Sequence, residues 1–209
     1  MGSKNKENFI YHYNLEVSNN RPPCGPGSEH SFIERSGTVT FLNTVIKKYN
    51  IKSINDCPSG LLSNWMHLVD FKDVDYVGYD INPLAVERNK KEFPAISFFE
   101  FDLVNEILPT ADLIICRDCF FHLSNNFVSK GLENFRKSGT KYLLSTSHYW
   151  LGKNNELTKK ELDIEAGYRH LNLEIAPYNM GSPLEIHIEG GWTPLDAGNN
   201  RQLSLWKLN

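Results

Sequence analysis

Short apolar segments alternate with amphipathic ones along most of this chain, and this alternation restricts its fold more than any other feature of the sequence. The apolar segments that we expect to form strands are residues 51–56, 75–80, 96–102, 111–116 and 141–146. Helical spacing of apolar residues predicts helices at residues 38–49, 61–68, 83–93 and 125–137. Strands that alternate with helices in this way form a parallel sheet with helices on both faces.

Two later segments, residues 184–188 and 202–206, alternate or nearly alternate apolar and polar residues. This pattern is typical of half-covered antiparallel strands, and we expect the two to pair at the edge of the sheet. The sequence therefore predicts an α/β fold with a doubly wound, seven-stranded sheet, mostly parallel, with an antiparallel C-terminal edge hairpin. Residues 151–182 form a long mixed segment before this pair, and we expect an insertion that faces the substrate.

The length of 209 residues suits one domain, which we assign to residues 25–209 after an N-terminal leader at residues 1–24. Residues 18–31 are rich in Gly and Pro, which disfavour regular structure. The net charge of −3 argues against a general nucleic-acid binder, because such proteins present a basic surface. No segment reaches the ~20 apolar residues that span a bilayer, and four scattered cysteines form no secreted disulfide framework. We therefore expect a cytoplasmic protein that does not act at membranes.

Carboxylates gather where the predicted strands end. Asp56 ends the first strand, Asp80 the second and Asp102 the third. In an open parallel sheet these ends lie along one edge, where ligands bind. Asp80 comes 20 residues after Gly60 (80 − 60), and a carboxylate at this position accepts hydrogen bonds from the ribose hydroxyls of an adenosine. Asp102 would then lie beside the adenine ring.

The turn after the first strand reads Asp56-Cys-Pro-Ser-Gly60. Its sequence indicates which of the adenosine-containing cofactors it could bind. A dinucleotide site needs several glycines and backbone N–H groups around the pyrophosphate, whereas this turn has one glycine and a proline. Its aspartate would also repel phosphate, but would favour a cationic methionine group. The turn therefore favours S-adenosylmethionine over a dinucleotide or ATP.

With these motifs the chain resembles the class I S-adenosylmethionine-dependent methyltransferases. The 56–60 turn is similar to their first motif, residues 79–82 to their ribose-binding motif, and residues 101–103 to their adenine-contacting motif. Pro58 is a departure, because it stands where the usual first motif has its first glycine. The chain also resembles a group of small bacterial and viral methyltransferases of mostly unassigned substrate, in residues 25–28, 64–66, 112–118, 169–173 and 205–206.

The resemblance implies a Rossmann-like fold, methyl transfer and a set of residues that hold S-adenosylmethionine. These residues are Gly25, Gly27, Ser28, Asp56, Pro58, Ser59, Gly60, Trp65, Asp80, Ile81, Asn82, Asp102, Leu103 and Arg117. The acceptor that we expect is a small or carbohydrate-like molecule, methylated on oxygen or nitrogen. A larger acceptor would dock on the 151–182 insertion or on a second subunit of a homo-oligomer.

The candidate catalytic residues are Asp118 and His122, four residues apart after the fourth strand. A helical turn there would place both on one face. Histidine titrates near neutral pH, which suits removal of a proton from an acceptor, while Asp118 either shares that task or positions the methionine group. The expected acceptor-binding residues are Arg117, His122, Arg169 and Asn172, whose arginines suit an anionic group on the acceptor. Further side chains that could lie around the acceptor are His148, Tyr149, Trp150, Tyr168 and His170.

Two other functions stay open as alternatives, a non-catalytic S-adenosylmethionine-binding protein and, less favoured, a nucleotide-dependent oxidoreductase. The sequence lacks the Asn/Asp-Pro-Pro-Tyr/Phe motif of adenine-N6 methyltransferases after the fourth strand. Neither Cys116 nor Cys119 follows a proline, as the nucleophile of cytosine-C5 enzymes does. Cys116 and Cys119 form a C-x-x-C pair without a second pair of ligands, so we expect no metal site.

Overall fold

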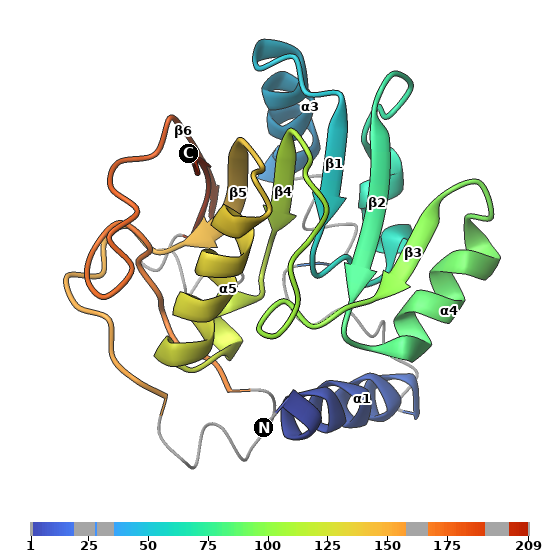
Figure 1. Cartoon of the computed structure of the whole chain (residues 1–209), viewed down its shortest axis with the longest axis horizontal. Coiled ribbons are helices and arrows are strands. Elements are labelled where there is room, and N and C mark those ends of the chain that lie inside the picture. Colours follow the sequence, from blue (N-terminus) through green and yellow to red (C-terminus); the bar gives the residue numbers. More distant parts are fainter. Residues whose placement is uncertain (1, 19–27, 29–35, 158–166, 191–200, 209) are drawn as a thin grey trace.

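The computed structural model describes residues 2–18, 28, 36–157, 167–190 and 201–208. Within these residues one seven-stranded sheet forms, in the order β3-β2-β1-β4-β5-β7-β6 (Figure 1). Its strands are β1 (Ser53–Asp56), β2 (Asp75–Asp80), β3 (Ser97–Glu100), β4 (Leu113–Cys116), β5 (Tyr142–Ser147), β6 (Glu185–Gly190) and β7 (Arg201–Lys207). The predicted α/β fold is confirmed, with each predicted strand ending within two residues of an observed one.

The sheet pairs its first five strands in parallel, and β7 runs antiparallel to both β5 and β6. Strands β2 and β3 lie on one side of β1, whereas β4 and β5 lie on the other. The order of the strands therefore reverses between β1 and β4. In open α/β sheets, ligands bind beyond the carboxyl ends of the strands at such a reversal.

Four α-helices lie within the described residues: α1 (Gly2–Ser18), α3 (Thr38–Lys48), α4 (Pro83–Glu92) and α5 (Asn125–Lys137). The Asn82 side chain accepts a hydrogen bond from Leu84 N at 3.0 Å, and Pro83 occupies the first turn of α4. Ser124 caps α5 in the same way. Side-chain caps and an early proline start helices because the first N–H groups have no partner inside the helix.

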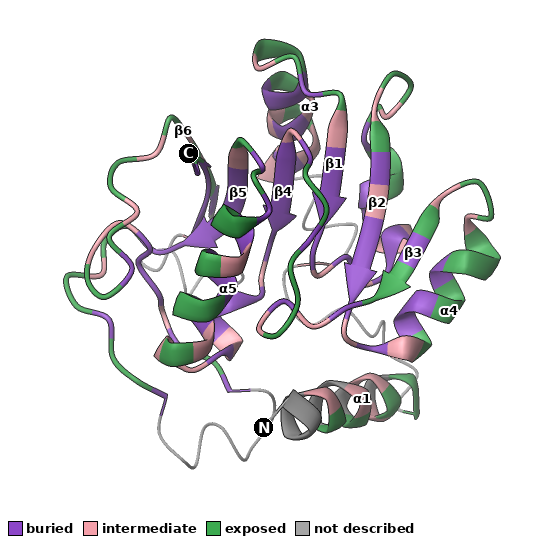
Figure 2. Cartoon of the chain, in the orientation of Figure 1, coloured by how far each residue is buried: buried purple, intermediate pink, exposed green. Residues whose placement is uncertain are grey.

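Successive side chains of the central strands point to opposite faces of the sheet and pack in two hydrophobic cores, one on each face. Ile114 packs in the cluster that includes Leu132 and Phe135 of α5, whereas Ile115 packs in the cluster with Leu42 of α3. Figure 2 shows the central strands buried along most of their length. The two cores fix the sheet rigidly and thereby fix the positions of the strand ends.

Two segments differ from the expectation. Residues 61–68 form two 3-10 turns, Leu62–Asn64 and Met66–Leu68, instead of the predicted helix. Ser63 and Asn64 are weak helix formers, and burial of Trp65 and its neighbours against the sheet overrides the helical spacing. Residues 2–18 form helix α1, in a segment for which the sequence pattern predicted no helix or strand. Figure 1 shows α1 across the carboxyl ends of β2 and β3, and Lys6 of this helix forms an ion pair with Glu100.

The described parts of the predicted insertion, residues 151–157 and 167–182, contain no helix or strand. The side chain of Asn154 ties them together, since its Nδ2 donates to the carbonyls of Asn172 and Ala176, both at 2.8 Å. Apart from Ser18 and Ser28, the Gly- and Pro-rich segment at residues 18–31 lies outside the described residues. No helix in the described part of the chain is long and apolar enough to cross a membrane.

Candidate functional site

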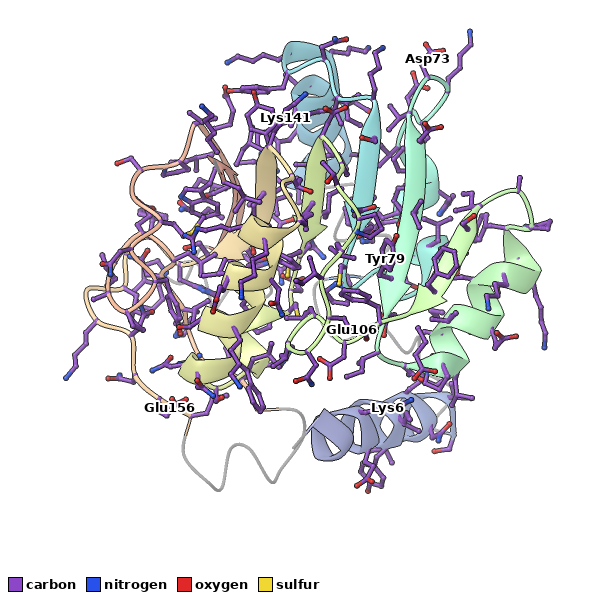
Figure 3. All side chains as sticks on the ribbon, in the orientation of Figure 1. Lys6, Asp73, Tyr79, Glu106, Lys141 and Glu156 are labelled. Carbon is purple, nitrogen blue, oxygen red and sulfur yellow. The ribbon has the colours of Figure 1, made fainter. Side chains whose placement is uncertain are left out.

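The parallel strands bring the predicted carboxylates to one edge of the sheet. In sheet order they are Asp102 after β3, Asp80 at the end of β2, Asp56 at the end of β1 and Asp118 after β4. Figure 3 labels Glu106 toward this edge, and Asp73 and Lys141 at the opposite edge. The edge therefore collects residues that are up to 62 positions apart in the sequence (118 − 56).

Asp80 is buried and holds the turn that follows β1. Its Oδ2 accepts a hydrogen bond from Gly60 N at 2.9 Å, and its Oδ1 accepts one from Asn82 N at 2.8 Å. Burial raises the pKa of Asp80, and these backbone donors act in the opposite direction. A carboxylate oxygen can accept more than one hydrogen bond, so each oxygen keeps capacity for a hydroxyl donor.

The turn itself leaves room for a ligand. Gly60 has a φ of +52°, and among the described residues, apart from its two chain neighbours, no atom lies within 4 Å of the position that a Cβ would take there. The Ser59 hydroxyl is buried and has no hydrogen-bond partner among the described residues. Open space beside a positive-φ glycine, an unpartnered hydroxyl and the Asp80 carboxylate together fit the adenosine and methionine groups of S-adenosylmethionine.

Asn89 of α4 supports this turn, although nothing in the sequence pattern predicted this role. Its Nδ2 donates to Gly60 O at 2.7 Å, and its Oδ1 accepts from Leu62 N at 3.0 Å. Asn89 is fully buried in a helix whose neighbouring residues are charged. A polar residue in such a helix looks solvent-exposed in the sequence, so no local signal marked it.

Asp56 lies beneath the turn rather than open to solvent. Tyr76 donates a hydrogen bond to its Oδ2 from the neighbouring strand. Burial raises the pKa of Asp56 to about 7, although the Tyr76 hydroxyl acts in the opposite direction, and nearby Asp80 raises the pKa further. The Asp56 carboxyl therefore changes its protonation state near neutral pH.

This raised pKa predicts a dependence of stability on pH. Between about pH 4 and pH 7 the folded state binds a proton at Asp56 that the unfolded state has released, so the free energy of unfolding falls as pH rises. Asp56→Asn carries no such charge and keeps an acceptor for Tyr76. From pH 4.5 to pH 7, the wild type should therefore lose free energy of unfolding that the variant keeps. We expect the difference in free energy of unfolding, variant minus wild type, to increase by more than about 1 kcal/mol over this range, as measured by urea denaturation. The exposed Asp73→Asn is the control, and parallel pH curves for wild type and Asp56→Asn would contradict the prediction.

The remaining predicted cofactor residues surround these groups. Asp102 holds its own loop, accepting hydrogen bonds from Val104 N at 2.9 Å and Asn105 Nδ2 at 2.7 Å. Leu103 is buried in the core beneath α5, and Ile81 and Pro58 are half-buried beside the turn. Gly25 and Gly27 lie outside the described residues.

Arg117 and Asp118 follow β4, on the other side of the reversal of strand order between β1 and β4. Arg117 Nη1 lies 2.9 Å from Asp118 Oδ2 and also donates to the Ser28 hydroxyl at 2.9 Å. Thr146 Oγ1 donates to Asp118 Oδ1 at 2.9 Å, and the Arg117 guanidinium stands over the Trp65 ring, 5.3 Å from its centroid. Ser28, Trp65 and Arg117, three of the predicted cofactor residues, thus meet at one point.

Glu189 of β6 and Arg201 of β7 join this pair, and neither was expected. Arg117 Nε lies 3.0 Å from Glu189 Oε1, and Arg201 Nη1 lies 3.0 Å from Asp118 Oδ2. Burial alone would raise the pKa of Asp118, but Arg117 and then Arg201 hold it below its ordinary value. Asp118 is therefore an ionised, clamped carboxylate at neutral pH and a poor general base.

His122 lies in a 3-10 turn, Phe120–His122, next to the clamped aspartate. Its Nδ1 forms a hydrogen bond with the carbonyl of Gly167. A carbonyl oxygen only accepts, so Nδ1 carries the proton of the neutral ring and Nε2 carries the acceptor lone pair. Asp118 and His122 are close enough for His122 to lower the pKa of that aspartate. The structure thus brings both predicted catalytic residues together.

A cluster of rings, which we call the ring cluster, lies beyond the ends of β4 and β5. It contains Phe121, His122, His148, Trp150, Tyr168 and His170. His170 contacts Trp150 with ring centroids 4.7 Å apart and Tyr168 at 5.6 Å. Trp150 is 38% exposed and Tyr168 53%, so the cluster presents aromatic surface. Burial lowers the pKa of His148 to about 4, with His170 adding to the effect, and His148 is therefore neutral at neutral pH.

Arg169 and Asn172, two of the predicted acceptor-binding residues, bond to the chain itself. Arg169 Nη2 donates to Leu123 O at 2.6 Å and to Tyr178 Oη at 3.2 Å, and Nη1 donates to Asn125. Asn172 Nδ2 donates to Leu151 O at 2.9 Å. Arg169 therefore holds the 151–182 segment onto the start of α5, whereas Asn172 holds it to the loop that follows β5.

Three cysteine thiols, those of Cys57, Cys116 and Cys119, are free and buried. Burial raises the pKa of the Cys57 and Cys116 thiols, which keeps them protonated and unreactive. Within the described residues, no group of three or more His, Cys, Asp or Glu side chains is arranged to hold a metal ion.

Solved structures with a similar fold exist, although no protein-family model and no curated protein sequence matches this chain. N-methyltransferase NodS from Bradyrhizobium japonicum WM9, in complex with S-adenosyl-L-homocysteine, aligns with a TM-score of 0.66. It is 14% identical, and the alignment covers 96% of this chain and 98% of NodS.

Magnesium protoporphyrin IX methyltransferase ChlM from Synechocystis PCC 6803, with bound S-adenosyl-L-homocysteine, aligns with a TM-score of 0.59 at 12% identity. The alignment covers 83% of each chain. The riboflavin-analogue dimethyltransferase RosA from Streptomyces davawensis aligns with a TM-score of 0.56 at 15% identity, over 84% of this chain and 54% of RosA. At these identities the likeness concerns the fold.

Proposed function

We infer that this chain, which has the fold of the class I S-adenosylmethionine-dependent methyltransferases, binds S-adenosylmethionine and methylates a small-molecule or carbohydrate-like acceptor on oxygen or nitrogen. The observation that carries this inference is the Asp80 carboxylate bonded to Gly60 N beside the open space at that glycine. It lies next to the strand reversal between β1 and β4, where this fold binds ligands. When bound, the cofactor supplies a methyl group on a positively charged sulfur.

The order of the strands assigns parts of the cofactor to particular residues. The adenosine part would lie at the ends of β2 and β3, with Asp80 accepting from the ribose and Asp102 beside the adenine. The methionine part would lie toward β1 and β4, near the 56–60 turn, Arg117 and Asp118.

The ring cluster beyond β4 and β5 is the region that we assign to the acceptor. Exposed Trp150 and Tyr168 provide flat apolar surface, and the histidines beside them provide hydrogen-bonding groups. Small-molecule sites combine such aromatic walls with a few placed polar groups. Arg117 and Arg169 already bond to groups of this chain, so the proposal does not depend on an anionic acceptor.

His122 is the residue that we assign to proton removal. Its Nε2 carries the acceptor lone pair because Nδ1 donates to Gly167 O. Nε2 would take the proton from the acceptor oxygen or nitrogen as that atom forms its bond to the methyl group. The ionised Asp118 nearby stabilises the resulting imidazolium, which makes Asp118 a supporting residue rather than a second base.

Titration calorimetry with S-adenosylhomocysteine tests the proposal without knowledge of the acceptor. We expect saturable one-to-one binding of S-adenosylhomocysteine and no heat of binding with NAD under the same conditions. The NAD titration is the control for a general nucleotide site. Binding of NAD without binding of S-adenosylhomocysteine would contradict the proposed methyltransferase function and favour an oxidoreductase.

A further inference from the structure

The C-terminal hairpin delivers two charged side chains to the end of β4. Glu189 comes from β6 and Arg201 from β7, and Arg201 pairs in register with Gly190. The Glu189 side chain is fully buried and that of Arg201 is 12% exposed. These two residues meet Arg117 and Asp118, and we call the four residues the charge ring.

The charge ring is closed by four ion pairs. Arg117 Nη1 lies 2.9 Å from Asp118 Oδ2, and Arg117 Nε lies 3.0 Å from Glu189 Oε1. Arg201 Nη1 lies 3.0 Å from Asp118 Oδ2, and Arg201 Nε lies 3.1 Å from Glu189 Oε2. Each arginine therefore bridges both carboxylates, and the ring carries no net charge.

Glu189 has further partners that fix its position. Thr38, at the start of α3, donates from Oγ1 to Glu189 Oε1 at 2.7 Å. A buried carboxylate is costly unless it is paired and hydrogen-bonded, and three partners meet this requirement. Through its ion pair with Arg117, Glu189 holds the guanidinium over the Trp65 ring.

We propose that Glu189 and Arg201 are positioning residues, which orient Arg117 and Asp118 toward the methionine part of the cofactor. This inference rests on the proposed function and adds to it that the C-terminal hairpin completes one half of the cofactor site. The other half does not involve the charge ring, since Asp80 and Asp102 form their hydrogen bonds with the loops after β1, β2 and β3. The two halves can therefore be tested separately, with one ligand that carries the amino-acid part and one that lacks it.

Glu189→Gln removes one charge from the ring with almost no change in shape. We expect it to weaken S-adenosylhomocysteine binding at least tenfold in calorimetry, while the affinity for adenosine stays within twofold of wild type. Glu185→Gln is the matched control, because Glu185 lies on the same strand but outside the charge ring. It forms an ion pair with Lys48 of α3 and accepts a hydrogen bond from Tyr49, the C-cap of that helix. We expect this control to leave both affinities unchanged.

Arg201→Lys provides a second variant if Glu189→Gln fails to fold, because lysine keeps the charge but cannot bridge two carboxylates as a guanidinium does. A loss confined to S-adenosylhomocysteine supports the positioning role. Unchanged affinities, or an equal loss for both ligands in folded protein, overturn it. Absence of S-adenosylhomocysteine binding by the wild type would instead overturn the proposed function, which keeps the two failures distinct.

Discussion

Asp80→Ala is expected to weaken S-adenosylhomocysteine binding by about 10²-fold or more. Hydrogen bonds to a charged group contribute about 1.5–3 kcal/mol each, and a ribose offers two hydroxyls to this carboxylate. Their joint loss of about 3 kcal/mol corresponds to about two factors of ten in affinity. The substitution also frees the backbone amides of Gly60 and Asn82, which loosens the turn beside the ligand. Titration calorimetry at a temperature well below the unfolding transition measures the effect.

Two variants separate ligand binding from stability. Asp80→Asn keeps an oxygen that can accept from one backbone amide, so it should fold well while still losing much of the affinity. Asp75→Ala is the control at the exposed opposite end of β2, and it should leave the affinity unchanged. If Asp80→Ala bound S-adenosylhomocysteine as tightly as wild type, the ribose would have to lie elsewhere.

Arg169→Ala is expected to lower the free energy of unfolding by about 3 kcal/mol or more. The guanidinium is buried and donates to Leu123 O, Tyr178 Oη and Asn125 Oδ1. Hydrogen bonds from a charged donor contribute about 1.5–3 kcal/mol each, and Leu123 O and Tyr178 Oη lose theirs together, whereas Asn125 Oδ1 keeps the Tyr178 hydroxyl as a donor. Urea denaturation at neutral pH measures the loss.

Arg88→Ala is the comparison for this experiment, because Arg88 is an exposed arginine paired with Glu92 on the surface of α4. Exposed pairs of this kind contribute less than about 1 kcal/mol, so the control should unfold almost as wild type does. A loss of under 1 kcal/mol for Arg169→Ala would reject the internal role. It would favour the direct contact with the acceptor that the sequence suggests.

Much of the sheet and half of the candidate site could be predicted from local sequence. Apolar runs bounded by turns predicted the five parallel strands, because strands covered on both faces are rich in apolar residues, and apolar–polar alternation predicted the two C-terminal strands. Asp80 and Asp102 were predicted since each lies at or just after the end of its strand, and parallel strands end at one edge. Asn82 and Pro83 marked the start of α4 by the same kind of local chemistry.

Local sequence failed where burial decided the conformation or the partner. The apolar spacing of residues 61–68 predicted a helix, but packing of Trp65 against the sheet produced two 3-10 turns. Asn89 looked like one more polar residue on the surface of α4, yet it is the side chain that holds the Gly60 turn. Neither outcome has a sequence signal, because both depend on which face of the segment meets the sheet.

The sequence by itself determined the α/β architecture, the antiparallel edge pair and the carboxylates at the strand ends, because periodicity and strand termination are local properties of the chain. Only the tertiary structure decided that Asp118 is a carboxylate held in ion pairs with two arginines, which makes it a poor base. It also decided that Arg169 forms hydrogen bonds with the chain around residues 151–182. It also placed Glu189 and Arg201 beside Arg117 and Asp118, although they lie 71 and 83 residues beyond Asp118 (189 − 118 and 201 − 118). Charged side chains so far apart find their partners only when sheet pairing buries them together, since burial is what makes each of them require a counter-charge.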